Sequence, residues 1–275
     1  MAIVAHVGVL EELDKYGALR FVKEWMGISA GALYALCLSL KFTLKECRQF
    51  ICNFDMTAIM DPDELTGWIC NYGFDTGNKL KKLAEAFLHE KGFASNATFA
   101  DLAAKGCTDL RVFATNLNTG KLMEFSRFKT PTYSISNAIR ASMTLPYYFQ
   151  PFQCPESGHY YYDGGVISNY PLRFLPEEEV KETLGVLFFK QVGVVETIGL
   201  NEILFRPTAI MFREDCNTEI LGFEKQTICV NMGVINPVNF EISSEEKNKL
   251  IELGAIATRN FLKNFRKPAR RYSVG

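Results

Sequence analysis

The sequence predicts an α/β fold in which helices cover both faces of a mostly parallel sheet. Short apolar segments bounded by polar residues alternate along the chain with longer segments of helical periodicity. This alternation is typical of parallel strands joined by helical crossovers. No internal repeat, low-complexity tract or Pro/Gly/Ser-rich linker divides the 275 residues. We therefore expect one domain spanning residues 1–275.

The first expected helix runs from Ile3 to Tyr16, because apolar residues recur there at helical spacing. Its apolar face consists of Ile3, Val7, Leu10 and Leu13, and its polar face of Glu11, Glu12, Asp14 and Lys15. Gly17 is suited to cap its carboxyl end. A short strand is expected over 21–26, followed by a glycine-flanked turn and an apolar helix over 30–40.

The remaining elements follow the same patterns. A helical hairpin is expected over 43–88, with Asp61-Pro62-Asp63 marking a break at a helix start. Strands are expected at 110–115, 121–125, 160–162, 183–189 and 227–232. Asn118-Thr119-Gly120 is expected to form the hairpin turn between the first two of these strands. Helices are expected over 136–142 and 244–265, the second opened by a capping box of Ser243 and Glu246.

Composition excludes several classes of function. A formal net charge of -1 gives no basis for nucleic-acid binding. The eight cysteines contain no C-x-x-C pair, which argues against a zinc site and for reduced core residues in a cytoplasmic protein. The sequence contains no EF-hand-like cluster of carboxylates that would indicate a calcium site, and we expect no metal or cofactor.

The longest apolar run, 30–40, is shorter than the about 20 residues that span a bilayer. The start of the sequence lacks the features of a signal peptide.

The motif Gly27-Ile28-Ser29-Ala30-Gly31 has the form G-x-S-x-G and lies where a strand is expected to turn into a helix. Such a turn holds the serine in a strained conformation with its hydroxyl exposed. Gly27 and Gly31 let the neighbouring backbone pass without a Cβ clash. The Ala30 N–H, at the amino end of the helix, is placed to act as an oxyanion donor. Ser29 is therefore a candidate nucleophile.

A serine nucleophile needs a base, and the chain offers two candidates. Of the three histidines, His6 falls in the first helix, His89 at the end of a charged helix and His159 in a loop. His159 is compatible with a Ser-His-Asp order, although no aspartate is marked as its partner. The sequence Asp163-Gly164-Gly165 follows the apolar run Tyr160–Tyr162, and so lies at the end of a strand, where open α/β sheets gather their sites.

These motifs together resemble the patatin-like phospholipase family. Besides the segments around Ser29 and Asp163, the stretches 111–126 (RVFATNLNTGKLMEFS), 133–152 (YSISNAIRASMTLPYYFQPF) and 161–171 (YYDGGVISNYP) are similar to family segments. The resemblance extends from His6 to about Leu262. It implies a three-layer α/β/α domain and a Ser-Asp dyad, with Ser29 as nucleophile and Asp163 as general base. It also implies lipid acyl esters as substrates and an acyl-enzyme intermediate, with Gly27, Ala30, Gly31, Gly164 and Gly165 as oxyanion or motif backbone.

One departure from the family pattern stands out. The family carries a first strand and a glycine-rich oxyanion loop before the helix that begins here near Ile3, and neither is found in this sequence. The sheet is therefore expected to expose an edge beside the nucleophile. Three hypotheses result. The first is an active lipid acyl hydrolase of the phospholipase A, lysophospholipase or acylglycerol lipase type. The second is a catalytically impaired module that binds lipid or a partner protein, and the third is a Ser-His-Asp esterase that uses His159.

Two segments suggest contact with lipid. The tail 263–275 carries five basic residues and no acidic one, a composition that attracts anionic headgroups. The aromatic stretch 147–152 is suited to line an acyl-chain groove or to pack in the core. The expected partner is thus a lipid or phospholipid substrate, met at the surface of a membrane or lipid droplet.

Overall fold

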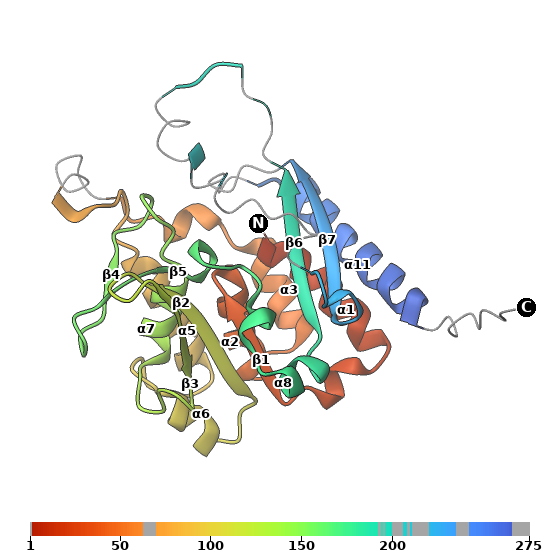
Figure 1. The fold of residues 1–275 in the computed structure, drawn as a ribbon, viewed down its shortest axis with the longest axis horizontal. Helices are drawn as coiled ribbons and strands as arrows, with labels where there is room; N and C mark the ends of the chain where they lie inside the picture. The colour runs from red at the N-terminus through yellow and green to blue at the C-terminus, as the bar shows by residue number, and fades with distance from the viewer. Residues whose placement is uncertain are drawn as a thin grey trace, which may run out of the picture.

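The computed structural model describes residues 2–62, 70–191, 194, 196–199, 206–207, 210, 220–234 and 242–265. Its strands form two sheets (Figure 1). The larger contains β1 (Glu24–Ile28), β2 (Asp109–Asn116), β3 (Lys121–Ser126), β4 (Phe152–Gln153) and β5 (Tyr160–Asp163). The smaller contains β6 (Gly185–Gln191) and β7 (Thr227–Val234). The basic residues beyond 265 lie outside the described part of the chain.

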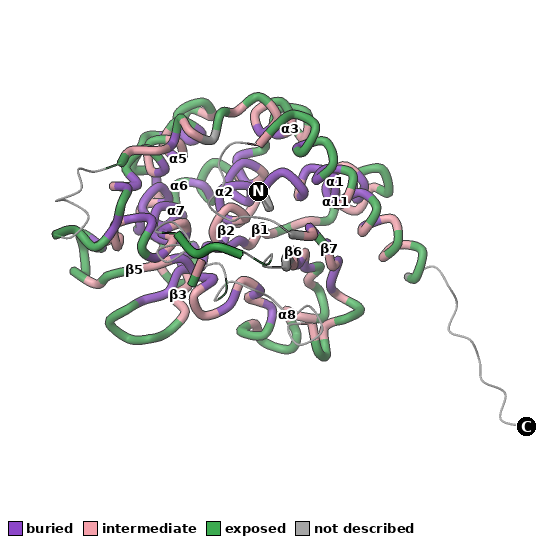
Figure 2. The backbone as a smooth tube through the Cα atoms, turned by 90° about the horizontal axis from the view of Figure 1, so that it is seen from above, coloured by how far each residue is buried: buried purple, intermediate pink, exposed green. Residues whose placement is uncertain are grey.

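The helices are α1 (Ala2–Lys15), α2 (Ala30–Ser39), α3 (Leu44–Asn53), α5 (Asn78–Glu90), α6 (Phe99–Ala104), α7 (Ile135–Ser142), α8 (Glu177–Lys181) and α11 (Ser244–Phe265). Short 3-10 turns occupy Ala18–Phe21, Met56–Ile59, Gly164–Val166, Pro171–Phe174 and Glu224–Gln226. Viewed along the sheet, α1, α2, α3, α5 and α11 lie on one side of the strands and α8 on the other (Figure 2). The expected α/β class, with helices on both faces, is confirmed.

The sheet is more mixed than the sequence analysis expected. β1 runs parallel to β2, and β6 runs parallel to β7. The pairs β2–β3, β2–β5 and β4–β5 are antiparallel. β3 runs antiparallel to β2 because the hairpin turn at 118–120 brings the chain straight back beside β2. β5 runs antiparallel to β2 although β3, α7 and β4 separate the two strands along the chain.

The edge expected beside the nucleophile strand is present. Within the described ranges, β1 pairs only with β2 and β6 pairs only with β7, so the two sheets are not hydrogen-bonded to each other. One edge of β1 and one edge of β6 are therefore left without a strand partner in the part of the chain that the structure describes.

Helix α1 is buried on more than one face because α11 covers it. Val4, Ala5 and Val9 are at most 3% exposed, although they fall outside the apolar face expected from the sequence. Glu12, expected on the polar face, is only 5% exposed. Its carboxylate pairs with Lys15 at 3.0 Å and with Arg259 of α11 at 3.2 Å. The expectation of a solvent-facing side at Glu12 was wrong because periodicity does not show a second helix packed there.

The α1–α11 crossing depends on glycine. A Cβ added at Gly254 would lie 2.2 Å from the Ala5 carbonyl oxygen, and one added at Gly8 would lie 1.8 Å from the Ile251 carbonyl oxygen. The two backbones are therefore too close for any side chain at these positions.

We expect Gly254→Ala to lower the free energy of unfolding by about 2 kcal/mol, because the helices must separate to admit the methyl group. Urea denaturation of the two proteins measures this. Ile256→Ala, on the exposed side of the same helix, is the control and should change stability by less than about 1 kcal/mol. Equal effects of the two substitutions would contradict the close crossing.

Two element boundaries differ from the expected ones. Residues 18–21 form a 3-10 turn, and the strand begins at Glu24 rather than Phe21. The helical hairpin expected over 43–88 is divided: α3 ends at Asn53, α5 begins only at Asn78, and Pro62 makes an isolated bridge with Asp75. The capping box of Ser243 and Glu246 is confirmed, with both reciprocal hydrogen bonds formed.

The described residues offer neither a membrane span nor a metal site. None of the helices in these ranges is long and apolar enough to cross a membrane. The same ranges hold no group of His, Cys, Asp and Glu side chains suited to a metal ion. Of the cysteines described, Cys37, Cys47 and Cys154 are buried and carry free thiols.

Candidate active site

Ser29 lies at the turn between β1 and α2 in a strained backbone conformation. Its φ is 55° and its ψ is -131°, a combination that residues with a side chain rarely adopt. Its carbonyl accepts from the Ala32 N–H at 2.9 Å, the first hydrogen bond of the helix. The strand-turn-helix context expected for the G-x-S-x-G motif is therefore present around Ser29.

Asp163 is the last residue of β5 and is 1% exposed. Its N–H donates to the Thr144 carbonyl at 2.7 Å, and its Oδ1 accepts from the Gly165 N–H at 2.8 Å. Thr115 Oγ1 donates to the Asp163 carbonyl at 2.9 Å. These contacts fix both the backbone and the carboxylate of Asp163.

The strand register brings Ser29 and Asp163 to the same place. β3 pairs with one edge of β2 along residues 111–116, so β1 and β5 must share the other edge. β1 runs parallel to β2 and ends with Ile28 opposite Phe113; β5 runs antiparallel and ends with Asp163 opposite Ala114. The carboxyl ends of two strands therefore meet head to head on one edge, with Ser29 following one strand and Asp163 ending the other.

Ser29 and Asp163 line one cavity of about 970 Å³. The motif 27–31 forms part of the cavity wall. One apolar region of the wall comprises Ile59, Leu80, Met143, Leu145 and Phe149. Phe149 also packs in a buried cluster with Ile59, Leu80 and Tyr148, so the aromatic stretch 147–152 contributes both to the cavity wall and to the core. The cavity thus joins the Ser29 hydroxyl, the Asp163 carboxylate and an apolar wall.

The first turn of α2 supplies the candidate oxyanion donors. The N–H groups of Ala30 and Gly31 have no hydrogen-bond acceptor among the described residues, as is usual at the amino end of a helix. Both residues line the cavity beside Ser29. A negative charge developing there would also be favoured by the helix dipole.

The motif glycines are not equivalent. A Cβ at Gly27 would lie 2.4 Å from the Gly31 carbonyl oxygen, and one at Gly164 would lie 2.8 Å from the Phe113 carbonyl oxygen. A Cβ at Gly31 would meet nothing closer than His6 Nε2 at 3.9 Å. Gly27 and Gly164 are required by close backbone packing. The expectation that Gly31 is needed for the same reason was wrong.

The histidines divide clearly between the cavity and the surface. His159 lies at the opposite end of β5 from Asp163, where its Nδ1 is 3.0 Å from Asn116 Nδ2, and it does not line the cavity that holds Ser29. His89 is exposed at the end of α5. His6 does line the cavity, with its ring 4.2 Å from that of Phe188. The structure thus removes the geometric support for a triad through His159.

The sequence analysis did not identify Ser142, which supports the turn at Ser29. The Ser29 N–H donates to Ser142 Oγ at 2.9 Å, and Ser142 Oγ donates to the Phe113 carbonyl at 2.7 Å. Ser142 is fully buried at the end of α7. No motif marks it, because the contact joins residues far apart in the sequence.

Ser142→Ala is expected to lower kcat by about tenfold with little change in KM, because the turn that positions Ser29 loses its tether. The unpaired Ser29 N–H should also cost about 2 kcal/mol of stability. Ser136→Ala removes a similarly buried hydroxyl from the same helix, one that contacts the Ser95 carbonyl and the Ser134 hydroxyl. That control should lose stability and keep kcat; an equal fall in kcat would show that Ser142 has no specific role.

The profile of the patatin-like phospholipase family matches residues 1–176, which is more than half of the chain and includes Ser29 and Asp163. The chain belongs to the patatin-like phospholipase family. The resemblance stated from the sequence motifs is thereby confirmed.

Relatives of this patatin-like chain occur in viruses and bacteria. An uncharacterized protein of Acanthamoeba polyphaga mimivirus is 28% identical over 67% of this chain and 61% of its own length. The uncharacterized protein YqhO of Bacillus subtilis is 26% identical over 95% of this chain and 94% of its own. A probable lipid hydrolase of Invertebrate iridescent virus 6 is 29% identical over 55% of this chain and 52% of its own.

Among solved structures, VipD from Legionella pneumophila shares the fold, with a TM-score of 0.65. The match covers 96% of this chain and 65% of VipD at 17% sequence identity. At this level of identity the similarity supports the three-layer architecture alone. The patatin-like chain spans less than two thirds of both VipD and the mimivirus relative.

Proposed function

We propose that this chain is a lipid acyl hydrolase in which Ser29 is the nucleophile and Asp163 its general base. The observation that carries the proposal is the meeting of β1 and β5 on one edge of β2, which brings the strained Ser29 turn to the buried Asp163. Membership of the patatin-like phospholipase family supports this assignment.

The proposed reaction has two halves. In the first half, Ser29 Oγ attacks the ester carbonyl while the Asp163 carboxylate takes the proton of the Ser29 hydroxyl. A buried carboxylate suits this role, because a carboxylate withdrawn from water accepts a proton more readily than a solvated one. The Ala30 and Gly31 N–H groups stabilise the oxyanion. The leaving alcohol then takes the proton from Asp163, which leaves the acyl-enzyme. In the second half, the same carboxylate activates a water molecule, and this water cleaves the acyl-enzyme.

The cavity supports a lipid acyl chain as the group bound. The side chains of Ile59, Leu80, Met143, Leu145 and Phe149 offer apolar surface in the cavity that Ser29 also lines. A relative is named as a probable lipid hydrolase. We propose a phospholipase A, lysophospholipase or acylglycerol lipase activity, exercised from the cytoplasm at the surface of a membrane or lipid droplet.

A fluorophosphonate with a long alkyl chain tests the proposal, because an activated serine oxygen displaces the fluoride and stays bound to phosphorus, whereas an ordinary serine does not react. We expect one adduct, located on Ser29 by peptide mass spectrometry. Labelling should be lost in Asp163→Asn and retained in His159→Ala. An adduct that depends on His159 would instead support an ordinary Ser-His-Asp esterase.

The divided sheet favours a second candidate function, a module that binds lipid or a partner protein without turnover. Within the described residues, the β1 edge beside Ser29 has no strand partner. A folded wild-type chain that binds phospholipid vesicles and forms no phosphonate adduct would establish this alternative.

A further inference from the structure

A buried arginine stands behind the apolar wall of the cavity. Arg140, in the last turn of α7, is only 4% exposed. Its guanidinium bonds to both ends of the loop 143–150 that follows this helix. Nη1 donates to Thr144 Oγ1 at 2.5 Å, and Nη2 donates to the Gln150 carbonyl at 2.9 Å. The loop supplies three residues of the cavity wall, which are Met143, Leu145 and Phe149.

The same guanidinium joins the loop to the segment before α5. Nη2 also donates to the Thr76 carbonyl at 2.8 Å. Backbone hydrogen bonds reinforce this junction, because the Gln150 N–H donates to the Asp75 carbonyl and the Asp75 N–H donates to the Tyr148 carbonyl, both at 2.8 Å. The loop 143–150 and the segment 75–77 are therefore held as one unit around the Arg140 side chain.

The fully buried Asp75 carboxylate extends this unit to the rest of the apolar wall. Its two oxygens accept from the Asp61 N–H at 2.5 Å and from the Gly77 N–H at 2.7 Å. Asp61 follows the 3-10 turn that ends at Ile59, and Gly77 caps α5, which carries Leu80. Ile59 and Leu80 are the remaining members of the apolar region of the cavity wall.

Thr144 connects Arg140 to Asp163. The Thr144 hydroxyl, which accepts from Arg140 Nη1, also donates to the Arg140 carbonyl at 2.7 Å. Both the side chain and the backbone of Arg140 thus fix Thr144, which is fully buried. The Thr144 carbonyl in turn accepts from the Asp163 N–H at 2.7 Å. The position of the proposed general base therefore depends on Arg140 through one intervening residue.

The site is shaped for a guanidinium group. The three acceptors described for it are neutral oxygens that lie in different directions, an arrangement that the planar fork of arginine reaches and a lysine ammonium does not. Burial lowers the pKa of Arg140 to about 10. A Cβ added at Gly77 would lie 2.2 Å from Arg140 Cζ, so the backbone there leaves room for the guanidinium and nothing more.

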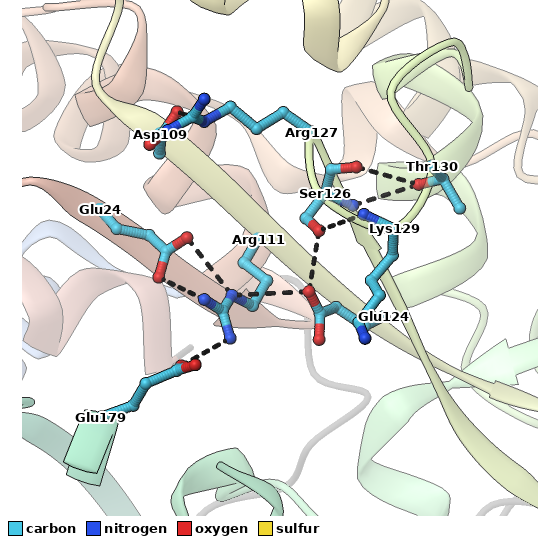
Figure 3. A network of polar contacts seen from close by, with 9 residues as sticks. All are labelled: Glu24, Asp109, Arg111, Glu124, Ser126, Arg127, Lys129, Thr130 and Glu179. Atoms are coloured by element: carbon cyan, nitrogen blue, oxygen red, sulfur yellow. Dashed lines mark hydrogen bonds and ion pairs between the residues drawn. The ribbon is translucent and has the colours of Figure 1, made fainter. Parts of the chain in front are cut away.

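A second buried arginine, Arg111, has different surroundings. Figure 3 shows its guanidinium among three carboxylates, with Glu24 and Glu179 each at 2.9 Å and Glu124 at 3.6 Å. These ion pairs join β1, β3 and α8. None of them involves the loop 143–150 or Asp163. Arg111 is therefore a matched control for the loss of a buried arginine.

We propose, on the basis of the hydrolase function proposed above, that Arg140 is a positioning residue for both the general base and the acyl-chain wall. Through Thr144 it holds Asp163 at the end of β5. Through Gln150 and Thr76 it holds the side chains that an acyl chain contacts. Arg140 touches neither the substrate nor Ser29, and it acts only through these residues.

The test compares hydrolysis of p-nitrophenyl butyrate and p-nitrophenyl laurate by the wild type and Arg140→Lys. The lysine keeps a positive charge but cannot bond to Thr144 and Gln150 together. We expect kcat to fall by about 10–100-fold with both esters, because Asp163 shifts from its place. KM for the laurate should rise by about tenfold more than KM for the butyrate, because only the long chain reaches the displaced wall.

Thr144→Val and Thr144→Ser form a matched pair that leaves Arg140 in place, and they decide the outcome if Arg140→Lys does not fold. Valine has nearly the shape of threonine but lacks the hydroxyl that Arg140 binds. Thr144→Val should therefore lower kcat by about tenfold with both esters. Thr144→Ser keeps the hydroxyl and should hold kcat within about twofold of the wild type.

Arg111→Lys should lose stability without changing the ratio of the two KM values, since a smaller folded fraction alters both esters alike. Wild-type kcat and an unchanged KM ratio in a folded Arg140→Lys would overturn the role of Arg140. So would equal kcat values in Thr144→Val and Thr144→Ser. A folded wild type that hydrolyses neither ester would instead overturn the proposed function, and the role of Arg140 with it.

Discussion

Asp163→Asn is expected to lower fatty-acid release by about 10²–10⁴-fold, the usual contribution of a positioned general base. The amide keeps the shape of the carboxyl group and can still accept from the Gly165 N–H through its oxygen. It cannot take the proton of the Ser29 hydroxyl. The loss should therefore appear in kcat, with vesicle binding unchanged.

Two measurements separate this loss from a structural effect. The thermal midpoint of Asp163→Asn should stay within a few degrees of the wild type, because the β5 hydrogen bonds to Thr115 and Thr144 involve the backbone of residue 163. His159→Ala, at the far end of the same strand, should keep its activity. Full activity in Asp163→Asn would remove Asp163 from the mechanism.

Gly27→Ala and Gly31→Ala are expected to differ sharply, although both substitutions alter the same motif. The Gly27 methyl would lie 2.4 Å from backbone of the α2 first turn, and we expect a loss of about 3 kcal/mol or more in stability. The Gly31 methyl would be in ordinary contact with His6. Because alanine is favoured over glycine within a helix, Gly31→Ala should preserve or raise stability by up to about 1 kcal/mol.

Chemical denaturation of both variants measures the difference, with near-ultraviolet circular dichroism as a check that each is folded. Similar losses at the two positions would contradict the packing described for the turn. A stable Gly31→Ala variant also shows that the second glycine of the motif is not a steric requirement of this fold.

The sequence was most informative where local chemistry decides the structure. The glycine-flanked turn at Ser29 and the Asp-Gly-Gly segment at Asp163 were both expected at strand ends, and both lie there. The capping box at Ser243 needed only residues of one helical turn. Such features depend on neighbours within a few positions.

Long-range features were not predictable in the same way. That β1 and β5 share one edge of β2 follows from pairings between distant segments, which no periodicity reports. The tether from Ser142 to Ser29 and the burial of Glu12 beneath α11 arise likewise from tertiary packing. The unpaired edges of β1 and β6 likewise depend on which strands pair across the described part of the chain.

The most direct test of the central claim is fatty-acid release from mixed phospholipid vesicles by the wild type and by Ser29→Ala. We expect release by the folded wild type and a reduction of about 10³-fold or more in the variant, because the acyl-enzyme cannot form without the hydroxyl. Release that persists undiminished in Ser29→Ala, or no release from a folded wild type, would contradict the assignment of Ser29 and Asp163 as a catalytic dyad.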